Sequence, residues 1–178
     1  MPHPDTNIIL IGMPGSGKST VGVVLAKRIS RNFVDTDVVI QTAIGRTLQS
    51  VVDNEGYLEL RKIEEKILVG LSCRGHVIAT GGSAVYSDAA MTHLKRNGLA
   101  VFLDVRLATL KARVRDYTTR GLAKRPDQTI DDLFAERFAL YTRYADLTVH
   151  CDALTHEEVC KQIEDLLAAP PSPLTRTM

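Results

Sequence analysis

The sequence has little of several residue types that mark special classes of protein. It contains no tryptophan and three cysteines, Cys73, Cys151 and Cys160, an odd number with no CxxC spacing. A disulfide framework or a structural zinc site is therefore not expected. We expect the protein to reside in a reducing compartment such as the cytoplasm. No apolar run approaches the ~18 residues of a membrane-spanning helix, and the first six residues lack the features of a signal peptide.

An excess of charge of either sign is also missing. Lys and Arg total 22 and Asp and Glu total 21, which leaves a formal charge of +1. This balance argues against a general nucleic-acid or membrane binder. The chain has 178 residues, of which 44% are hydrophobic and 24% charged, as is typical of one globular domain. We expect that domain to span residues 1–169 and a flexible tail to occupy residues 170–178.

Short apolar runs alternate with segments of helical periodicity. Five runs predict strands, at residues 7–11, 32–35, 77–80, 99–103 and 146–149. None alternates cleanly between polar and apolar residues, as is usual for strands covered on both faces. Apolar residues at helical spacing predict helices at 60–71, 107–114 and 159–167, the last with Thr155 and Glu158 as a capping box. This order predicts a three-layer α/β fold with a five-stranded parallel sheet and ligands at the carboxyl ends of its strands.

A phosphate-binding loop follows the first expected strand. Residues 12–20 carry the GxxxxGKS pattern between a strand and a helix. The glycines let successive backbone N–H groups point at one anion, and the helix opening near Lys18 adds its positive dipole end. Lys18 would reach the outer phosphates, and the Ser19 hydroxyl would bind Mg²⁺. The predicted nucleotide-binding residues of this loop are Gly12, Gly15, Ser16, Gly17, Lys18, Ser19 and Thr20.

The class of nucleotide-binding protein follows from what accompanies the loop. The chain has no Asn-Lys-x-Asp segment of the kind that reads guanine, so ATP is the expected nucleotide. Its length leaves room for little beyond the nucleotide-binding fold, which favours a small kinase over a switch or a motor. A glycine-rich turn that only ends a strand is the alternative interpretation of the loop itself.

Two carboxylates, Asp35 and Asp37, follow the second expected strand. Residues i and i+2 of a strand share a face, so both could point over the same edge of the sheet. Phosphoryl transfer requires a metal position and a group that orients the acceptor hydroxyl, and two carboxylates could divide these tasks. Asp37 could instead cap a helix that begins at Val38, without losing a catalytic role.

Two further charged groupings have both functional and ordinary explanations. Glu64 lies three residues after Arg61 on one helix face and could orient its guanidinium toward a carboxylate, or the two could form a solvated ion pair. Residues 105–126 carry seven basic residues and one acid, a local count of +6. A lid over a polyphosphate, at about 115–128, explains this charge, and a solvated basic helix is the alternative. Four histidines without metal spacing, at 76, 93, 150 and 156, are interpreted as structural.

The ordered set of motifs resembles the shikimate kinase family over about residues 8–167. To the phosphate loop and the Asp35-x-Asp37 pair it adds Gly56-x-x-x-Leu60-Arg61-x-x-Glu64, Thr80-Gly81-Gly82, Arg120 with the Gly-Leu-Ala after it, and Glu136-Arg137-x-x-Leu140-Tyr141. The loop alone is unspecific, whereas five motifs in the family's order and at its distances are much more specific.

The resemblance implies ATP- and Mg²⁺-dependent phosphorylation of the 3-hydroxyl of shikimate. It implies that Asp35 holds the Mg²⁺ shell and that Asp37 is the base or orienter of the acceptor hydroxyl. Arg61 and Arg137 would grip the substrate carboxylate. The other implied contacts are Gly81 and Gly82 with the ring hydroxyls, Arg113 with adenine, and Arg120, from the lid, with the transferred phosphoryl. Lys18, Asp37 and Arg120 would form the catalytic set.

The chain departs from the usual family pattern on the acceptor side. Ser83 stands where a third glycine is usual, and the lid reads Arg-Gly-Leu-Ala over 120–123 instead of Arg-Pro-Leu-Leu. Two alternatives therefore stay open: a kinase of another small hydroxylated acid, and a nucleotide-binding regulatory protein without turnover. We expect a monomer whose partners are ATP and a small hydroxylated carboxylic acid, with no nucleic acid or membrane.

Overall fold

The computed structural model describes residues 1–113 and 121–169. Arg120, the beginning of the expected lid and the tail at 170–178 lie outside the described residues. The strands are β1 (Asn7–Ile11), β2 (Asn32–Asp35), β3 (His76–Ala79), β4 (Gly98–Asp104) and β5 (Leu147–His150). They form one parallel sheet in the order β2-β3-β1-β4-β5. The expected five-stranded parallel sheet is confirmed: β1 and β2 have the expected bounds, and the ends of β3, β4 and β5 differ from the expected ones by one residue.

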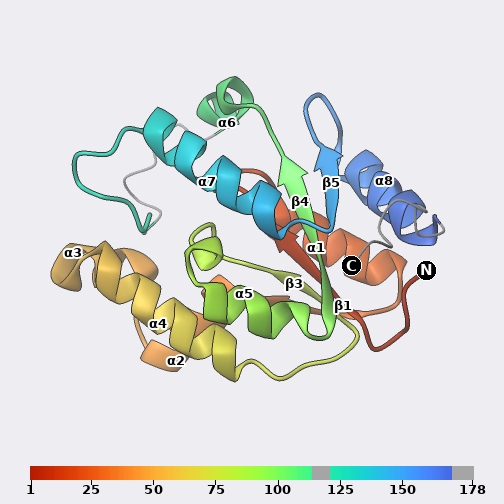
Figure 1. The fold of residues 1–178 in the computed structure, drawn as a ribbon, viewed down its shortest axis with the longest axis horizontal. Helices are drawn as coiled ribbons and strands as arrows, with labels where there is room; N and C mark the ends of the chain where they lie inside the picture. Colours follow the sequence, from red (N-terminus) through yellow and green to blue (C-terminus); the bar gives the residue numbers. More distant parts are fainter. Residues whose placement is uncertain (114–120, 170–178) are drawn as a thin grey trace, which may run out of the picture.

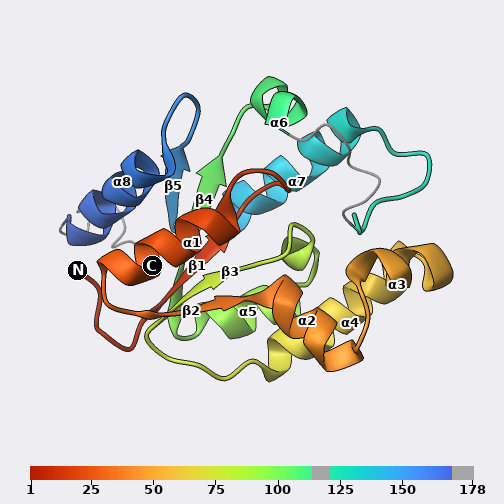
Figure 2. The same cartoon turned by 180° about the vertical axis from the view of Figure 1, so that it is seen from behind.

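Helices cover both faces of this sheet. They are α1 (Lys18–Arg28), α2 (Thr36–Ile44), α3 (Leu48–Glu55), α4 (Tyr57–Gly70), α5 (Asp88–Lys95), α6 (Leu107–Arg113), α7 (Ile130–Tyr144) and α8 (His156–Ala168), with a 3₁₀ turn η1 (Ala84–Tyr86). α5 and α7 lie on one face and α1 and α8 on the other, while α2, α3 and α4 pack together at one side (Figures 1 and 2). The three-layer arrangement is therefore confirmed. Among the described residues no helix is both long and apolar enough to cross a membrane.

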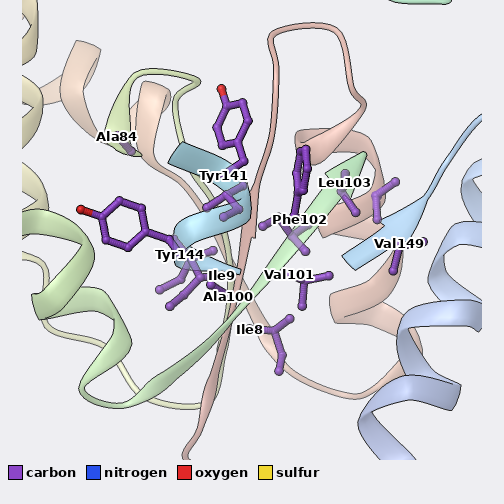
Figure 3. Packing of buried hydrophobic residues seen from close by; sticks show 14 of the residues in the cluster. Ile8, Ile9, Ala84, Ala100, Val101, Phe102, Leu103, Tyr141, Tyr144 and Val149 are labelled. Carbon is purple, nitrogen blue, oxygen red and sulfur yellow. The ribbon is translucent and has the colours of Figure 1, made fainter. Parts of the chain in front are cut away.

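The central strand β1 is the most deeply buried element of the core. All four of its aliphatic residues, Ile8 to Ile11, are inaccessible to solvent, since β1 lies between β3 and β4 and under helices on both faces. Phe102 of β4 stacks on Tyr141 of α7 with ring centroids 5.2 Å apart, and Figure 3 shows the two in the same packed layer. The Tyr141 hydroxyl donates to the carbonyl oxygen of Gly82 at 2.7 Å. The core thereby fixes the loop that follows β3.

Side-chain caps define where two of the late helices begin. The hydroxyl of Thr155 accepts from the backbone N–H of Glu158, whose carboxylate accepts from the Thr155 N–H, so the predicted capping box of α8 is confirmed. Thr129 and Asp132 form the same motif at the start of α7. These caps fix the N-termini of α7 and α8, which lie on opposite faces of the sheet.

Candidate active site

A cavity of about 740 Å³ opens beside the phosphate loop and the residues that follow β3. Its wall includes nine residues that the sequence predicted: Gly15, Gly17, Lys18, Ser19, Thr20, Asp37, Gly81, Gly82 and Arg137. Five other predicted residues that the structure describes lie outside the wall: Gly12, Ser16, Asp35, Arg61 and Arg113. Arg120 is not among the described residues. The fold thus joins the nucleotide-side and acceptor-side motifs in one space.

The phosphate loop is built for an anion. Gly12, Gly15 and Gly17 have φ angles of 148°, 86° and 96°, and a Cβ on Gly12 would lie 2.9 Å from the carbonyl oxygen of Leu103. The Lys18 ammonium donates to the carbonyl oxygens of Gly12 and Met13 at 2.8 and 2.9 Å. Burial lowers the pKa of Lys18 to about 8, an effect that the charge of Asp37 opposes.

One polar atom of the loop has no partner within the described part of the chain. The hydroxyl of Ser16 is buried and accepts or donates no hydrogen bond there. A buried hydroxyl without a partner is costly, since the protein gives it nothing in exchange for its lost hydration. Together with the buried Lys18 cation and the start of α1, it fits an anionic ligand such as a polyphosphate.

The carboxylates of Asp35 and Asp37 sit in different elements, contrary to their expected placement on one strand face. β2 ends at Asp35, and Asp37 lies in the first turn of α2. The interpretation of Asp37 as a helix cap is wrong, because Asp35 is the N-cap: its Oδ1 accepts from the N–H groups of Asp37 and Val38 at 3.0 and 3.4 Å. Burial raises the pKa of Asp37, as does the nearby Asp35, while Lys18 opposes the shift.

Two guanidinium groups converge on one oxygen atom. Arg61 of α4 and Arg137 of α7 both donate to the carbonyl oxygen of Ala123, at 2.9 and 3.1 Å. The Arg61 guanidinium lies 3.4 Å from the centre of the Tyr86 ring, and Arg137 is 1% exposed. Both side chains are thus held in place by packing and both point at the same acceptor. This arrangement fits the two-oxygen geometry of a substrate carboxylate.

Glu64 does not orient Arg61, and this expectation is corrected by the structure. Its Oε2 accepts a hydrogen bond of 2.6 Å from the hydroxyl of Ser83, while Arg61 is held by Tyr86 and Ala123. Although i and i+3 residues are neighbours on a helix, the two side chains leave α4 toward different partners. Glu64 is 4% exposed, and its burial raises the pKa to about 7 against the opposing effect of Ser83.

This buried carboxyl makes a pH-dependent contribution to stability. The pKa of Glu64 is higher in the folded protein than the ordinary value of 4.5, so the folded state favours the neutral form. Its contribution is complete below about pH 4.5 and is lost as the pH rises through about 7. We expect Glu64→Gln, which stays neutral, to stabilise the protein relative to wild type by about 2–3 kcal/mol at pH 8 and much less at pH 5.

Urea unfolding of both proteins at pH 5, 6, 7 and 8 measures this difference in the free energy of unfolding. Several charged groups face Glu64 and set the size of the effect: Asp37, Arg61, Arg137 and Lys18. A difference that is the same at every pH would contradict the raised pKa. Glu65→Gln, at the neighbouring exposed position on α4, is the matched control and should show no pH-dependent gain.

The expected lid is described from Gly121 onward, and this part contacts α3 and α4. The N–H of Gly121 donates to the Gln49 side chain at 2.6 Å, and Ala123 packs in an apolar cluster with Val51 and Leu60. Gln49 was not predicted from the sequence, because a glutamine on a short helix gives no signal of a contact 72 residues away. This apolar cluster holds Ala123 where its carbonyl oxygen accepts hydrogen bonds from Arg61 and Arg137.

The local excess of positive charge is smaller than the count over 105–126 suggests. In the described part of this segment, three basic residues form ion pairs with acids from other segments: Arg106 with Asp152, Lys111 with Asp131, and Arg125 with Glu136. These pairs are largely exposed, so each contributes little to stability. They connect the described part of the segment to α7 and to the turn after β5.

His156, interpreted from the sequence as structural, lines the cavity. Its imidazole would lie 3.5 Å from a Cβ on Gly17, and it occupies the first position of α8. Sequence spacing does not reveal this, because His156 reaches the phosphate loop only through the packing of α8 on α1. Tyr86, whose ring supports Arg61, is a further contact that the sequence did not reveal.

Comparisons with known proteins agree with this site. The family model for shikimate kinase matches residues 14–168. A shikimate kinase of Sulfurihydrogenibium sp. is 35% identical over 88% of this chain and 95% of its own. One of Rippkaea orientalis is 40% identical over 80% of this chain and 77% of its own.

Solved structures give the same result. The shikimate kinase of Acinetobacter baumannii in complex with shikimate superimposes with a TM-score of 0.84 at 30% identity, over 91% of this chain and 92% of that one. The phosphate loop, the paired arginines and the extent of these matches lead to one conclusion: the chain belongs to the shikimate kinase family.

Proposed function

We propose that this enzyme transfers the γ-phosphoryl group of ATP to the 3-hydroxyl of shikimate, giving ADP and shikimate 3-phosphate. The observation that carries the proposal is the single cavity that holds an anion-binding loop, the Asp37 carboxylate and Arg137. The chain's membership of the shikimate kinase family supports shikimate as the acceptor. The shikimate bound by the Acinetobacter baumannii protein supports it as well.

The residues divide the work of the transfer. The phosphate loop and Lys18 bind the phosphates of ATP, and Arg61 and Arg137 bind the carboxylate of shikimate in place of the Ala123 carbonyl. Asp37 accepts the proton of the 3-hydroxyl while the oxygen of that hydroxyl forms the new bond to phosphorus. The bond between the γ-phosphorus and the bridging oxygen breaks, and ADP leaves with that oxygen. The raised pKa of Asp37 makes it a better base than an ordinary carboxylate.

Gly81 and Gly82 let the acceptor approach the backbone. A Cβ on Gly82 would lie 2.8 Å from the Arg137 guanidinium and 2.9 Å from Pro14, so no larger residue fits between the loop and the arginine. On the nucleotide side, we assign Arg113, the last residue of α6, to the adenine. Arg120 keeps its sequence-based assignment to the transferred phosphoryl.

The residues present fit a magnesium ion at the phosphates. Ser19 and Asp35 would hold it: a hydroxyl and a carboxylate are the hard oxygen donors that Mg²⁺ prefers, and the Asp35 cap bonds use only Oδ1. Bound there with ATP, Mg²⁺ supplies charge neutralisation at the β- and γ-phosphates. The chain itself contributes the orientation of both ligands, since Ser19 is fixed by the first turn of α1 and Asp35 by its helix cap.

A direct assay tests the proposed function. Purified protein with ATP, Mg²⁺ and a panel of small hydroxylated acids is expected to phosphorylate shikimate with the highest kcat/KM, and ³¹P NMR of the product should show a phosphate ester at the 3-hydroxyl. Absence of turnover at millimolar shikimate would overturn the proposal. So would a higher kcat/KM for another acid of the panel.

Arg61→Ala tests the carboxylate clamp. The variant loses a charged hydrogen bond to the acceptor, so we expect the KM for shikimate to rise about 10- to 100-fold and the KM for ATP to stay within about twofold. Steady-state kinetics with each substrate varied in turn measure this split. Arg46→Ala removes a guanidinium that pairs with Glu55, neither of which lines the cavity, and should change neither constant. A comparable loss of ATP affinity in Arg61→Ala would contradict the assignment.

A further inference from the structure

Ser83 and Glu64 form a buried hydrogen-bonded pair inside the acceptor half of the cavity. Both line the cavity, they are 8% and 4% exposed, and their side-chain oxygens are 2.6 Å apart. A buried carboxylate is tolerated only with hydrogen bonds or a cationic partner. Within the described part of the chain, Ser83 is the one residue that bonds to the Glu64 carboxyl.

The second oxygen of Glu64 lies beside Gly81, and both residues line the cavity. A Cβ on Gly81 would overlap Oε1 of Glu64 and would lie 2.7 Å from Oδ1 of Asp37. Two carboxylate oxygens, one from α4 and one from α2, therefore flank the same glycine. Only a residue without a side chain leaves room between them, and that room adjoins the cavity.

The cations that face Glu64 make their hydrogen bonds to carbonyl groups and not to this carboxyl. Arg61 and Arg137 point at the Ala123 carbonyl, and Lys18 bonds to carbonyl groups of the phosphate loop. Oε1 of Glu64 therefore suits a neutral hydrogen-bond donor of the substrate. The substrate carboxylate binds instead to the two arginines. A hydroxyl group is the neutral donor that a polyhydroxylated acid provides.

We propose that Ser83 is a positioning residue that holds Glu64 so that its free oxygen accepts a hydrogen bond from the acceptor hydroxyl next to the one phosphorylated. Asp37 and Glu64 then read two hydroxyls on neighbouring ring carbons. The site selects acids with adjacent hydroxyls, and shikimate offers its 3- and 4-hydroxyls. This inference rests on the proposed function, because it takes the 3-hydroxyl as the one that Asp37 receives.

Removing the Ser83 hydroxyl leaves the Glu64 carboxyl without its holder. Within the described part of the chain no other residue bonds to this carboxyl, so Glu64 is expected to lose its fixed orientation. That change withdraws Oε1 from the acceptor, while Arg61 keeps its contacts with Ala123 and Tyr86. A threonine keeps the hydroxyl and should keep the geometry, whereas alanine and glycine cannot.

Steady-state kinetics with shikimate and 4-deoxyshikimate test the inference. Ser83→Ala is expected to raise the KM for shikimate about tenfold, with the KM for ATP within about twofold, and Ser83→Thr should restore the wild-type value. With 4-deoxyshikimate, wild type and Ser83→Ala should have the same KM within about twofold. In a Glu64→Ala background, Ser83→Ala should have no further effect.

Three results would overturn it: an unchanged KM in Ser83→Ala, an equal loss with 4-deoxyshikimate, or an additive loss in the Glu64→Ala background. Each would mean that Ser83 does not act through Glu64 on that hydroxyl. Melting temperatures of the variants separate a loss of packing from a loss of positioning, because a packing defect would raise the KM for both acceptors alike.

A measurement without any acceptor keeps this inference distinct from the proposed function. ¹³C NMR of the Glu64 carboxyl in the full chain should show a higher titration midpoint in Ser83→Ala than in wild type, since the lost hydrogen bond favours the charged form. The facing charges of Asp37, Arg61, Arg137 and Lys18 are the same in both proteins. An equal midpoint overturns the positioning role, whereas failure of wild type to phosphorylate shikimate overturns the proposed function.

Discussion

Lys18→Met is expected to reduce kcat/KM by roughly 10³-fold or more. The phosphates of ATP would lose the one buried cation that the phosphate loop presents within the described part of the chain. Methionine has a similar length and no charge. The side-chain packing inside the loop is therefore kept, whereas the electrostatic attraction to the phosphates of ATP is lost. Calorimetric titration with ATP and steady-state kinetics measure the two consequences.

Stability separates this outcome from misfolding. Burial lowers the pKa of Lys18 to about 8, which means that the folded protein holds this cation at a disadvantage. Lys18→Met removes that disadvantage, and we expect its melting temperature to be no lower than that of wild type. Lys27→Met, an exposed lysine in the last turn of α1, is the matched control and should retain full activity. ATP affinity within threefold of wild type in Lys18→Met would contradict the assignment.

Asp37→Asn is expected to lower kcat by about 10²- to 10⁴-fold while the KM values for shikimate and ATP change little. Asparagine keeps the shape and an oxygen that can accept from the acceptor hydroxyl, but it takes up no proton. The carboxylate lies close to Lys18, and its pKa is raised mainly by burial. Single-turnover kinetics that isolate the chemical step are the appropriate measurement.

The position of Asp37 makes the control for this variant important. Its backbone N–H donates to the cap residue Asp35, so the helix start must be shown to be intact. Circular dichroism and the melting temperature of Asp37→Asn should match those of wild type. Asp53→Asn changes an exposed carboxylate outside the cavity wall and should leave kcat unchanged. A kcat of Asp37→Asn within threefold of wild type would mean that this carboxylate is not the base.

Local patterns were sufficient wherever a residue's role depends on its sequence neighbours. The GxxxxGKS segment predicts a loop between β1 and α1, and α1 begins at Lys18 as expected. Thr155 and Glu158 predict the start of α8 because a capping box is formed within four residues. The apolar runs predict the inner strands β1, β3 and β4, since strands that are buried on both faces have few polar positions.

Local patterns were misleading where two residues close in sequence have distant partners. Arg61 and Glu64 share a face of α4, yet Arg61 is held by Ala123, 62 residues away, and Glu64 by Ser83, 19 residues away. Asp35 and Asp37 were expected on one strand, but the cap formed by Asp35 starts α2 between them. In each case a competing hydrogen bond decided the direction of a side chain.

The sequence by itself determined the order of the elements, the anion-binding loop and the identity of the charged residues near it. Only the tertiary structure decided how these residues combine: which guanidiniums converge on Ala123, which carboxyl is buried beside Ser83, and that His156 borders the loop. The physical reason is that motif spacing reflects bonds within a few residues, whereas burial and charge depend on segments brought together by packing. The departure at Ser83, a single residue by sequence, acquires a role only because the fold places it 2.6 Å from Glu64.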